Sequence, residues 1–291
     1  MSGDQKRIDE PTGVETTGHA WDGLEELNNP LPRWWLTVFY ITVIWSVAYW
    51  VFMPSWPTLS GHLQGLRGHT ERANVAEALD ALEDSRSVFM SQLAGADTLD
   101  TIQADAALFQ FARQAGASAF GNNCATCHGS GGQGAPGYPV LRDDDWLWGG
   151  TLDQIRYTLQ VGIRSTNDDT LFSIMPAFGQ DGILDKDDIK SVVEYVRQIS
   201  GQEAETAFLE RGETVFQEQC VACHGENGEG LQALGAPNLT DVIWLYGGDR
   251  EALTETITYS RYGVMPHWNE RLDEGTIAAL AIHVHSLGGG E

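Results

Sequence analysis

The sequence predicts an all-α protein made of one N-terminal transmembrane helix, a helical connector and two tandem domains of similar sequence. Three observations support this fold class. Residues 34–53 form an apolar run without a single charge, which has the length of a membrane span. Apolar residues further along the chain recur at helical spacing. The pattern Cys-x-x-Cys-His occurs twice, at 124–128 and 220–224, within segments that resemble each other.

The first two elements are a polar arm, residues 1–33, and the transmembrane helix, residues 34–53. Tryptophan and tyrosine residues lie at both ends of the apolar run, as they do at membrane interfaces. A cleaved signal peptide is the alternative interpretation. It fits less well, because a long acidic arm precedes the run and Pro54-Ser55-Trp56-Pro57 follows where a small-residue cleavage site would stand. A buried core helix would need a large domain around it.

The third element is a connector, residues 54–105. Within it the sequence predicts a helix from Thr70 to about Ala94. Thr70 is a suitable N-cap, and apolar residues recur every three or four positions from Val75 to Leu93. We expect this helix to space and dock the domains that follow it.

The two Cys-x-x-Cys-His motifs use all four cysteines of the chain. Two thiols one helical turn apart can bond to the vinyl groups of one haem, and the adjacent imidazole can bind its iron. Zinc or a redox disulfide is the alternative for an isolated cysteine pair, but here each pair carries its own histidine inside a repeated segment. We therefore predict two covalently attached haem c groups. The predicted attachment residues are Cys124, Cys127, Cys220 and Cys223, and the predicted iron ligands are His128 and His224.

The last two elements are the repeated domains, residues 106–200 and 205–288. A glycine and a phenylalanine precede each haem motif, as Gly116-x-x-x-Phe120 and Gly212-x-x-x-Phe216, and an amphipathic helix closes each repeat. This order resembles class I cytochrome c, whose first and last helices cross at such a glycine. We expect two class I cytochrome c domains, each complete on its own. Only five residues, from Ser200 to Ala204, separate them, which predicts packed domains and not a flexible tether.

The sixth iron ligands predicted from the sequence are Met175 and Met265. They are the only methionines among five that fall within the repeats, and a proline follows each of them. Each lies between a Trp-rich Gly-Gly segment and the closing helix, where class I cytochrome c carries its distal methionine. A thioether is a soft, neutral ligand that raises the reduction potential and closes the iron to substrates. His267 is the alternative for the second haem, and a methionine supplied by the other repeat is a further alternative.

The chain is strongly acidic, with 41 Asp and Glu against 17 Lys and Arg and a net charge of −24. This charge repels phosphate backbones, so we expect no nucleic-acid binding. A basic protein partner would be attracted to the surface, although acidity also serves solubility alone. The sequence contains no phosphate-binding glycine loop, no serine nucleophile elbow and no His-x-x-x-His pair, and we expect no catalytic site on this chain.

The arm and anchor carry the residues that point to one family. Within residues 15–35 the stretches WDGLEEL and NPLPRWW resemble the N-terminal signature of the CcoP or FixP family, the dihaem subunit (subunit III) of cbb3-type cytochrome c oxidase. Arm, anchor, connector and two cytochrome domains follow in the order of that family. Some members carry two membrane helices, whereas this chain shows one.

The resemblance implies an electron-transfer role. The chain would accept electrons from a soluble periplasmic cytochrome c and pass them, through a monohaem cytochrome c subunit, to the haem–copper catalytic subunit that reduces oxygen and pumps protons. It would lie in the bacterial inner membrane, with membrane lipid around the anchor, the arm in the cytoplasm and both haem domains in the periplasm.

Other functions share part of this pattern. A membrane-tethered dihaem carrier could serve a dehydrogenase or a nitric oxide reductase. A dihaem peroxidase would need one iron open to peroxide, and two methionine ligands argue against it. The Trp, Pro and Asn residues of the arm fit simple interfacial anchoring, and they also fit docking on other subunits or recruitment of an assembly factor.

Overall fold

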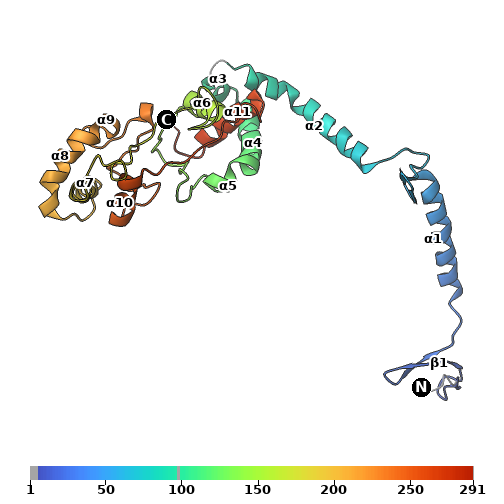
Figure 1. Cartoon of the computed structure of the whole chain (residues 1–291). Coiled ribbons are helices and arrows are strands. Elements are labelled where there is room, and N and C mark those ends of the chain that lie inside the picture. Colours follow the sequence, from blue (N-terminus) through green and yellow to red (C-terminus); the bar gives the residue numbers. More distant parts are fainter. Residues whose placement is uncertain (1–5, 97–98, 291) are drawn as a thin grey trace. The chain divides into compact units, whose positions relative to one another are not determined.

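The protein is described here from a computed structural model that covers residues 6–96 and 99–290. The chain divides into two compact units, residues 1–83 and 84–291 (Figure 1). As expected, the described residues are mostly helical. The first unit contains the arm and the apolar helix, and the second contains both cysteine motifs.

The arm folds into a β-hairpin that the sequence analysis did not predict. Strand β1 (Thr16–Trp21) pairs antiparallel with β2 (Leu24–Leu27), and Trp21 lies opposite Leu24. The turn between them is Asp22-Gly23, whose φ angles are 53° and 83°. A two-residue turn with both φ angles positive matches the twist of a hairpin, and Asp-Gly is a preferred sequence for it.

Helix α1 (Arg33–Phe52) is the predicted membrane helix, displaced by one residue from the expected bounds. Its mean hydropathy is 1.6, none of its side chains is buried, and within the described residues it is the single helix long and apolar enough to cross a membrane. A small hairpin of β3 (Pro57–Thr58) and β4 (Gly61–His62) follows it. Helix α1 is therefore an apolar rod whose whole circumference is available to lipid.

Helix α2 (Glu71–Ala94) matches the helix expected in the connector. The hydroxyl of Thr70 accepts a hydrogen bond from the backbone N–H of Ala73 at 3.0 Å, which is the predicted N-cap. The last turns of α2 bury Leu93 in the core of the second unit.

Besides the end of α2, the second unit contains nine α-helices among its described residues. They are α3 (Asp100–Gln103), α4 (Ala106–Asn123), α5 (Ala125–His128), α6 (Leu152–Val161), α7 (Lys186–Ile199), α8 (Leu209–Gln219), α9 (Val221–His224), α10 (Arg250–Tyr259) and α11 (Glu274–His285), with 3₁₀ turns η1 (Thr206–Phe208) and η2 (Gln232–Leu234). Aspartates cap four of the longer helices by accepting backbone N–H groups, and these caps are Asp105, Asp185, Asp249 and Asp273.

The two repeats exchange their closing helices. Helix α11, which closes the second repeat, packs on α4, which opens the first, and α7, which closes the first repeat, packs on α8, which opens the second (Figure 1). Likewise α6 packs on α11, and α10 packs on α7. The expectation that each repeat is complete on its own is therefore wrong.

The helices group into two bodies within this unit. The first haem body consists of α4, α5, α6 and α11, and the second haem body consists of α7, α8, α9 and α10. The second haem body is thus one continuous stretch of chain in which the closing helix precedes the opening helix. The first haem body combines α4, α5 and α6, which precede that stretch in the sequence, with α11, which follows it.

The short connection between α7 and α8 gives a physical reason for this exchange. Neighbouring helices joined by a short loop pack against each other as an antiparallel pair. Each haem body needs an opening helix packed on a closing helix, and the short connection from α7 to α8 brings such a pair together directly. Helix α11 is then left to cover α4.

Candidate haem sites

Each proximal histidine is held in the tautomer that iron requires. Nδ1 of His128 lies 3.0 Å from the carbonyl oxygen of Pro139, and Nδ1 of His224 lies 3.0 Å from that of Pro237. A carbonyl can only accept, so Nδ1 carries the hydrogen and Nε2 keeps its lone pair for a metal. Burial lowers the pKa of both imidazoles, and the carbonyl hydrogen bond opposes that shift in part. Both rings are therefore neutral near pH 7.

The cysteines share one backbone arrangement in the two motifs. Cys124 ends α4 and Cys220 ends α8, and the following turn brings the histidine N–H to the cysteine carbonyl at 3.0 Å and 2.9 Å. Burial, with a smaller contribution from the second cysteine, raises the pKa of Cys124 to about 11 and that of Cys220 to about 12. Among the described residues no group of three or more His, Cys, Asp or Glu could hold a metal ion, so these pairs find no further zinc ligands there.

The helix crossings confirm the predicted role of the two glycines and correct their partners. A Cβ at Gly116 would lie 2.1 Å from the carbonyl oxygen of Ala279 on α11, and one at Gly212 would lie 2.1 Å from that of Ser191 on α7. No side chain fits at either crossing. One turn later Phe120 and Phe216 are fully buried beside the cysteines.

Met265 lies in the first haem body, although it belongs to the second repeat. It packs against the apolar core that contains Cys124 and Phe120. Two backbone hydrogen bonds fix it there. The N–H of Ile163, two residues after the end of α6, donates to the carbonyl of Met265 at 2.9 Å, and the N–H of Met265 donates to the carbonyl of Ile163 at 3.0 Å. Nε2 of His267 lies 3.4 Å from a carboxylate oxygen of Glu270, on the same segment as Met265, which the structure does not place in the second haem body.

Met175 lies in the second haem body by the same exchange. It packs against the core that contains Phe216 and Leu239, with Cys220 beside it. The hydroxyl of Ser260, just after α10, donates to the carbonyl of Met175. The structure thus places Met265 against the core that contains Cys124, and Met175 against the core on which Cys220 packs. Sequence analysis named both methionines but expected each of them beside the haem motif of its own repeat.

His283 of α11 packs beside Phe120. Its ring lies 5.4 Å from that of Phe120, centroid to centroid, and burial lowers its pKa.

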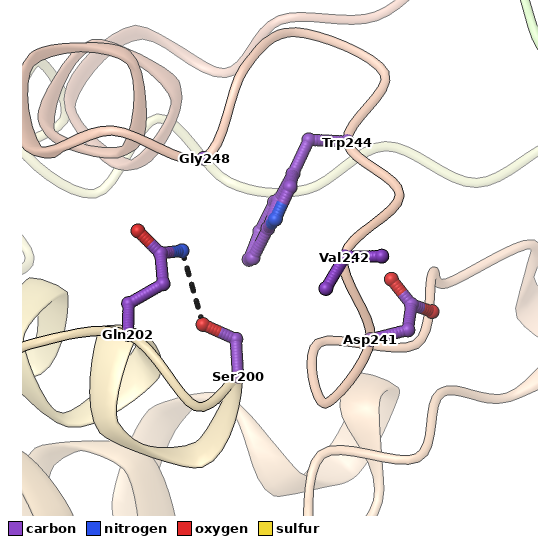
Figure 2. Close-up of a pocket in the computed structure, with 6 residues that line it drawn as sticks. All are labelled: Ser200, Gln202, Asp241, Val242, Trp244 and Gly248. Carbon is purple, nitrogen blue, oxygen red and sulfur yellow. Dashed lines mark hydrogen bonds between the residues drawn. The ribbon is translucent and has the colours of Figure 1, made fainter.

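Two hollows in the second unit lie apart from the cysteine motifs. One, of about 300 Å³, lies beside Trp244, whose indole projects between Gln202 and Val242; the amide of Gln202 donates to the Ser200 hydroxyl at 3.1 Å (Figure 2). The other, of about 510 Å³, is lined by residues of α6 and η2 and by loop residues, among them Trp148, Tyr157 and Gln232. Neither is lined by a cysteine, histidine or methionine.

The donor set of each body fits a covalent haem. Each body offers two thiols, one neutral imidazole with Nε2 available, and one thioether that packs on the same core. When bound, the haem supplies an iron that cycles between two oxidation states. The two thiols of each body would anchor it, and the imidazole and the thioether would complete its coordination.

Comparison with known proteins agrees with this chemistry. Residues 13–60 match the family "N-terminal domain of cytochrome oxidase-cbb3, FixP", residues 114–200 match "Cytochrome c", and residues 207–284 match "Cytochrome C oxidase, cbb3-type, subunit III". The two cytochrome c matches support the prediction of two covalently bound haem c groups.

Relatives of nearly the same length share about half of the sequence. The chain is 52% identical over 282 residues to the cbb3-type cytochrome c oxidase subunit CcoP of Cereibacter sphaeroides, covering 97% of both chains. It is 53% identical over 289 residues to the subunit FixP of Bradyrhizobium diazoefficiens, covering 99% of both. The chain therefore belongs to the CcoP/FixP family, the membrane-anchored dihaem cytochrome c subunits of cbb3-type cytochrome c oxidase.

Proposed function

We propose that this electron-transfer subunit holds its two irons by exchanged His/Met pairs, His128 with Met265 and His224 with Met175. The packing of each methionine on the core of the other repeat's cysteine carries the proposal. Cys124 and Cys127 anchor one haem, and Cys220 and Cys223 anchor the other.

This ligation makes the chain a carrier and not a catalyst. A neutral thioether stabilises the reduced iron and leaves no position for oxygen or peroxide. Oxygen reduction then belongs to another subunit of the oxidase, and electrons only pass through this one. A dihaem peroxidase, one of the alternatives from the sequence, gains no specific support from the arrangement.

The proposed donor is a soluble periplasmic cytochrome c with a basic docking face. The residues after the anchor hold 34 Asp and Glu against 14 Lys and Arg, a net charge of −20 that supports electrostatic attraction of such a donor. The proposed route leads through the monohaem subunit to the haem–copper subunit. Helix α1 would cross the inner membrane with the arm in the cytoplasm, because covalent haem attachment takes place on the outer side.

Carbon monoxide binding to the reduced, detergent-solubilised holoprotein tests the ligation. We expect neither haem to bind carbon monoxide in the unmodified chain, and each of the variants Met175→Leu and Met265→Leu to open one haem. Ready binding to the unmodified protein would contradict the carrier function. Reduction rates with a basic soluble cytochrome c should fall as ionic strength rises; a rate independent of salt would contradict the proposed donor.

A further inference from the structure

Arg164 joins the two methionine segments at one point. Its Nε donates to the carbonyl of Gly263 at 2.6 Å, and its Nη1 donates to the carbonyl of Ser173 at 2.9 Å. Gly263 stands two residues before Met265, and Ser173 stands two residues before Met175. One guanidinium therefore binds the carbonyl that lies two residues before the methionine in each of the two repeats.

The local backbone is shaped to present this side chain. Arg164 has a φ of 50°, in the left-handed region that L side chains rarely adopt. The neighbouring residue, Ile163, pairs with the backbone of Met265, and the N–H of Arg164 itself donates to Leu171 at 2.8 Å. Such a conformation persists only where the surroundings impose it, and it marks a candidate functional position.

The charge of Arg164 is partly buried, and no carboxylate among the described residues compensates it. The groups that act on it electrostatically are the phenol rings of Tyr246 and Tyr262, and the Tyr262 ring lies 5.8 Å away. A guanidinium in this setting stays protonated. Its rigid fork can hold two carbonyls at once, whereas a lysine ammonium has no such fixed geometry.

We propose that Arg164 is a positioning residue that sets the sixth ligands of both haems together. By holding the segment ahead of each methionine, it would keep both thioethers on their irons, and its positive charge would favour the reduced state of both. This proposal rests on the exchanged His/Met ligation proposed above.

Three variants of the whole holoprotein test the proposal. Arg164→Gln removes the charge and the fork, and Arg164→Lys keeps the charge but not the fork. The control is Arg197→Gln, because Arg197 is also half-buried and donates to the carbonyl of Glu203 and to Gln202, away from both methionines. The readouts are the charge-transfer absorption of methionine-ligated ferric haem, the displacement of methionine by imidazole, and the midpoint potential of each haem.

We expect Arg164→Gln to weaken the absorption at both haems, to lower both potentials, and to make imidazole bind about tenfold more tightly at each, as the loss of one charge-assisted hydrogen bond per methionine segment implies. Arg164→Lys should lower both midpoint potentials less than Arg164→Gln does. It should still bind imidazole more tightly at both haems than the unmodified protein. Arg197→Gln should resemble the unmodified protein. If Arg164→Gln does not accumulate with both haems, imidazole binding to the Arg164→Lys variant tests the proposal alone.

A change at one haem only, or no change at either, would overturn the proposal. Absence of the charge-transfer absorption in the unmodified protein would instead contradict the His/Met ligation itself. The two failures are therefore distinguishable.

Discussion

The exchange of closing helices predicts which piece of the chain can fold alone. Residues 171–262 contain Met175, the whole second haem body and its cysteine motif. Residues 205–288 correspond to the second repeat in sequence order, but they lack α7. Both pieces can be directed to the periplasm behind the same signal peptide and matured with haem.

The packing of α7 gives the size of the expected difference. Four of its aliphatic side chains, Ile189, Val192, Val193 and Val196, are at most 4% exposed. Each such burial contributes about 1.5–3 kcal/mol, so losing α7 removes about 6–12 kcal/mol. That loss is comparable to the whole stability of a typical domain, about 5–15 kcal/mol. The piece without α7 should therefore be unfolded around α8.

Protease resistance and carbon monoxide binding provide the assay. We expect residues 171–262 to yield a protease-resistant haem protein whose iron does not bind carbon monoxide. Residues 205–288 should be degraded or bind carbon monoxide readily. The reasoning would be refuted if residues 205–288 gave the compact, closed haem protein and residues 171–262 did not.

Three further predictions concern stability of the second unit. Gly212→Ala should destabilise it by about 2 kcal/mol despite the better helix propensity of alanine, because the new methyl meets α7 backbone; denaturant unfolding without a change in stability would contradict the crossing. Glu194 is buried and its pKa is lowered first by the hydrogen bond from Arg250, so it stabilises the fold above about pH 4.5 and that contribution is lost as pH falls through the lowered folded-state value. Glu194→Gln should lower the melting temperature at pH 7 and make it decrease less steeply as the pH is lowered. If the melting temperature of the variant decreased in acid as steeply as that of the unmodified protein, this assignment would be contradicted. The pKa of Asp241 is raised to about 6, first by burial and then by Asp145 among others, so its stabilising contribution is complete below about pH 4 and is lost as pH rises through about 6. Asp241→Asn should therefore raise the melting temperature at pH 8 more than at pH 4, and the reverse order would contradict the assignment.

Much of the fold followed from local patterns. The apolar run, the Thr70 cap and the helical spacing of the connector are short-range signals, and the structure contains α1 and α2 almost as predicted. The cysteine motifs and the methionines identified the candidate ligands because those residue types carry the chemistry themselves. The β-hairpin of the arm was missed, although Asp22-Gly23 is a strong turn signal.

The pairing of ligands could not be obtained from the repeat alone. An exchanged and an unexchanged arrangement use the same helices, the same glycines and the same apolar residues, so the sequence pattern is equal in both. The signal that distinguishes them is the short connection from Ser200 to Ala204, which favours direct packing of α7 on α8. The sequence analysis used this linker to predict packed domains and did not follow it to the helix pairing.

The central claim is that each haem takes its sixth ligand from the other repeat. An experimental structure of the holoprotein, by electron cryo-microscopy or crystallography, tests it most directly through the sulfur atom bound to each iron. We predict Met265 on the iron held by His128 and Met175 on the iron held by His224. Met175 on the His128 iron, Met265 on the His224 iron, or a histidine in either sixth position would contradict the account.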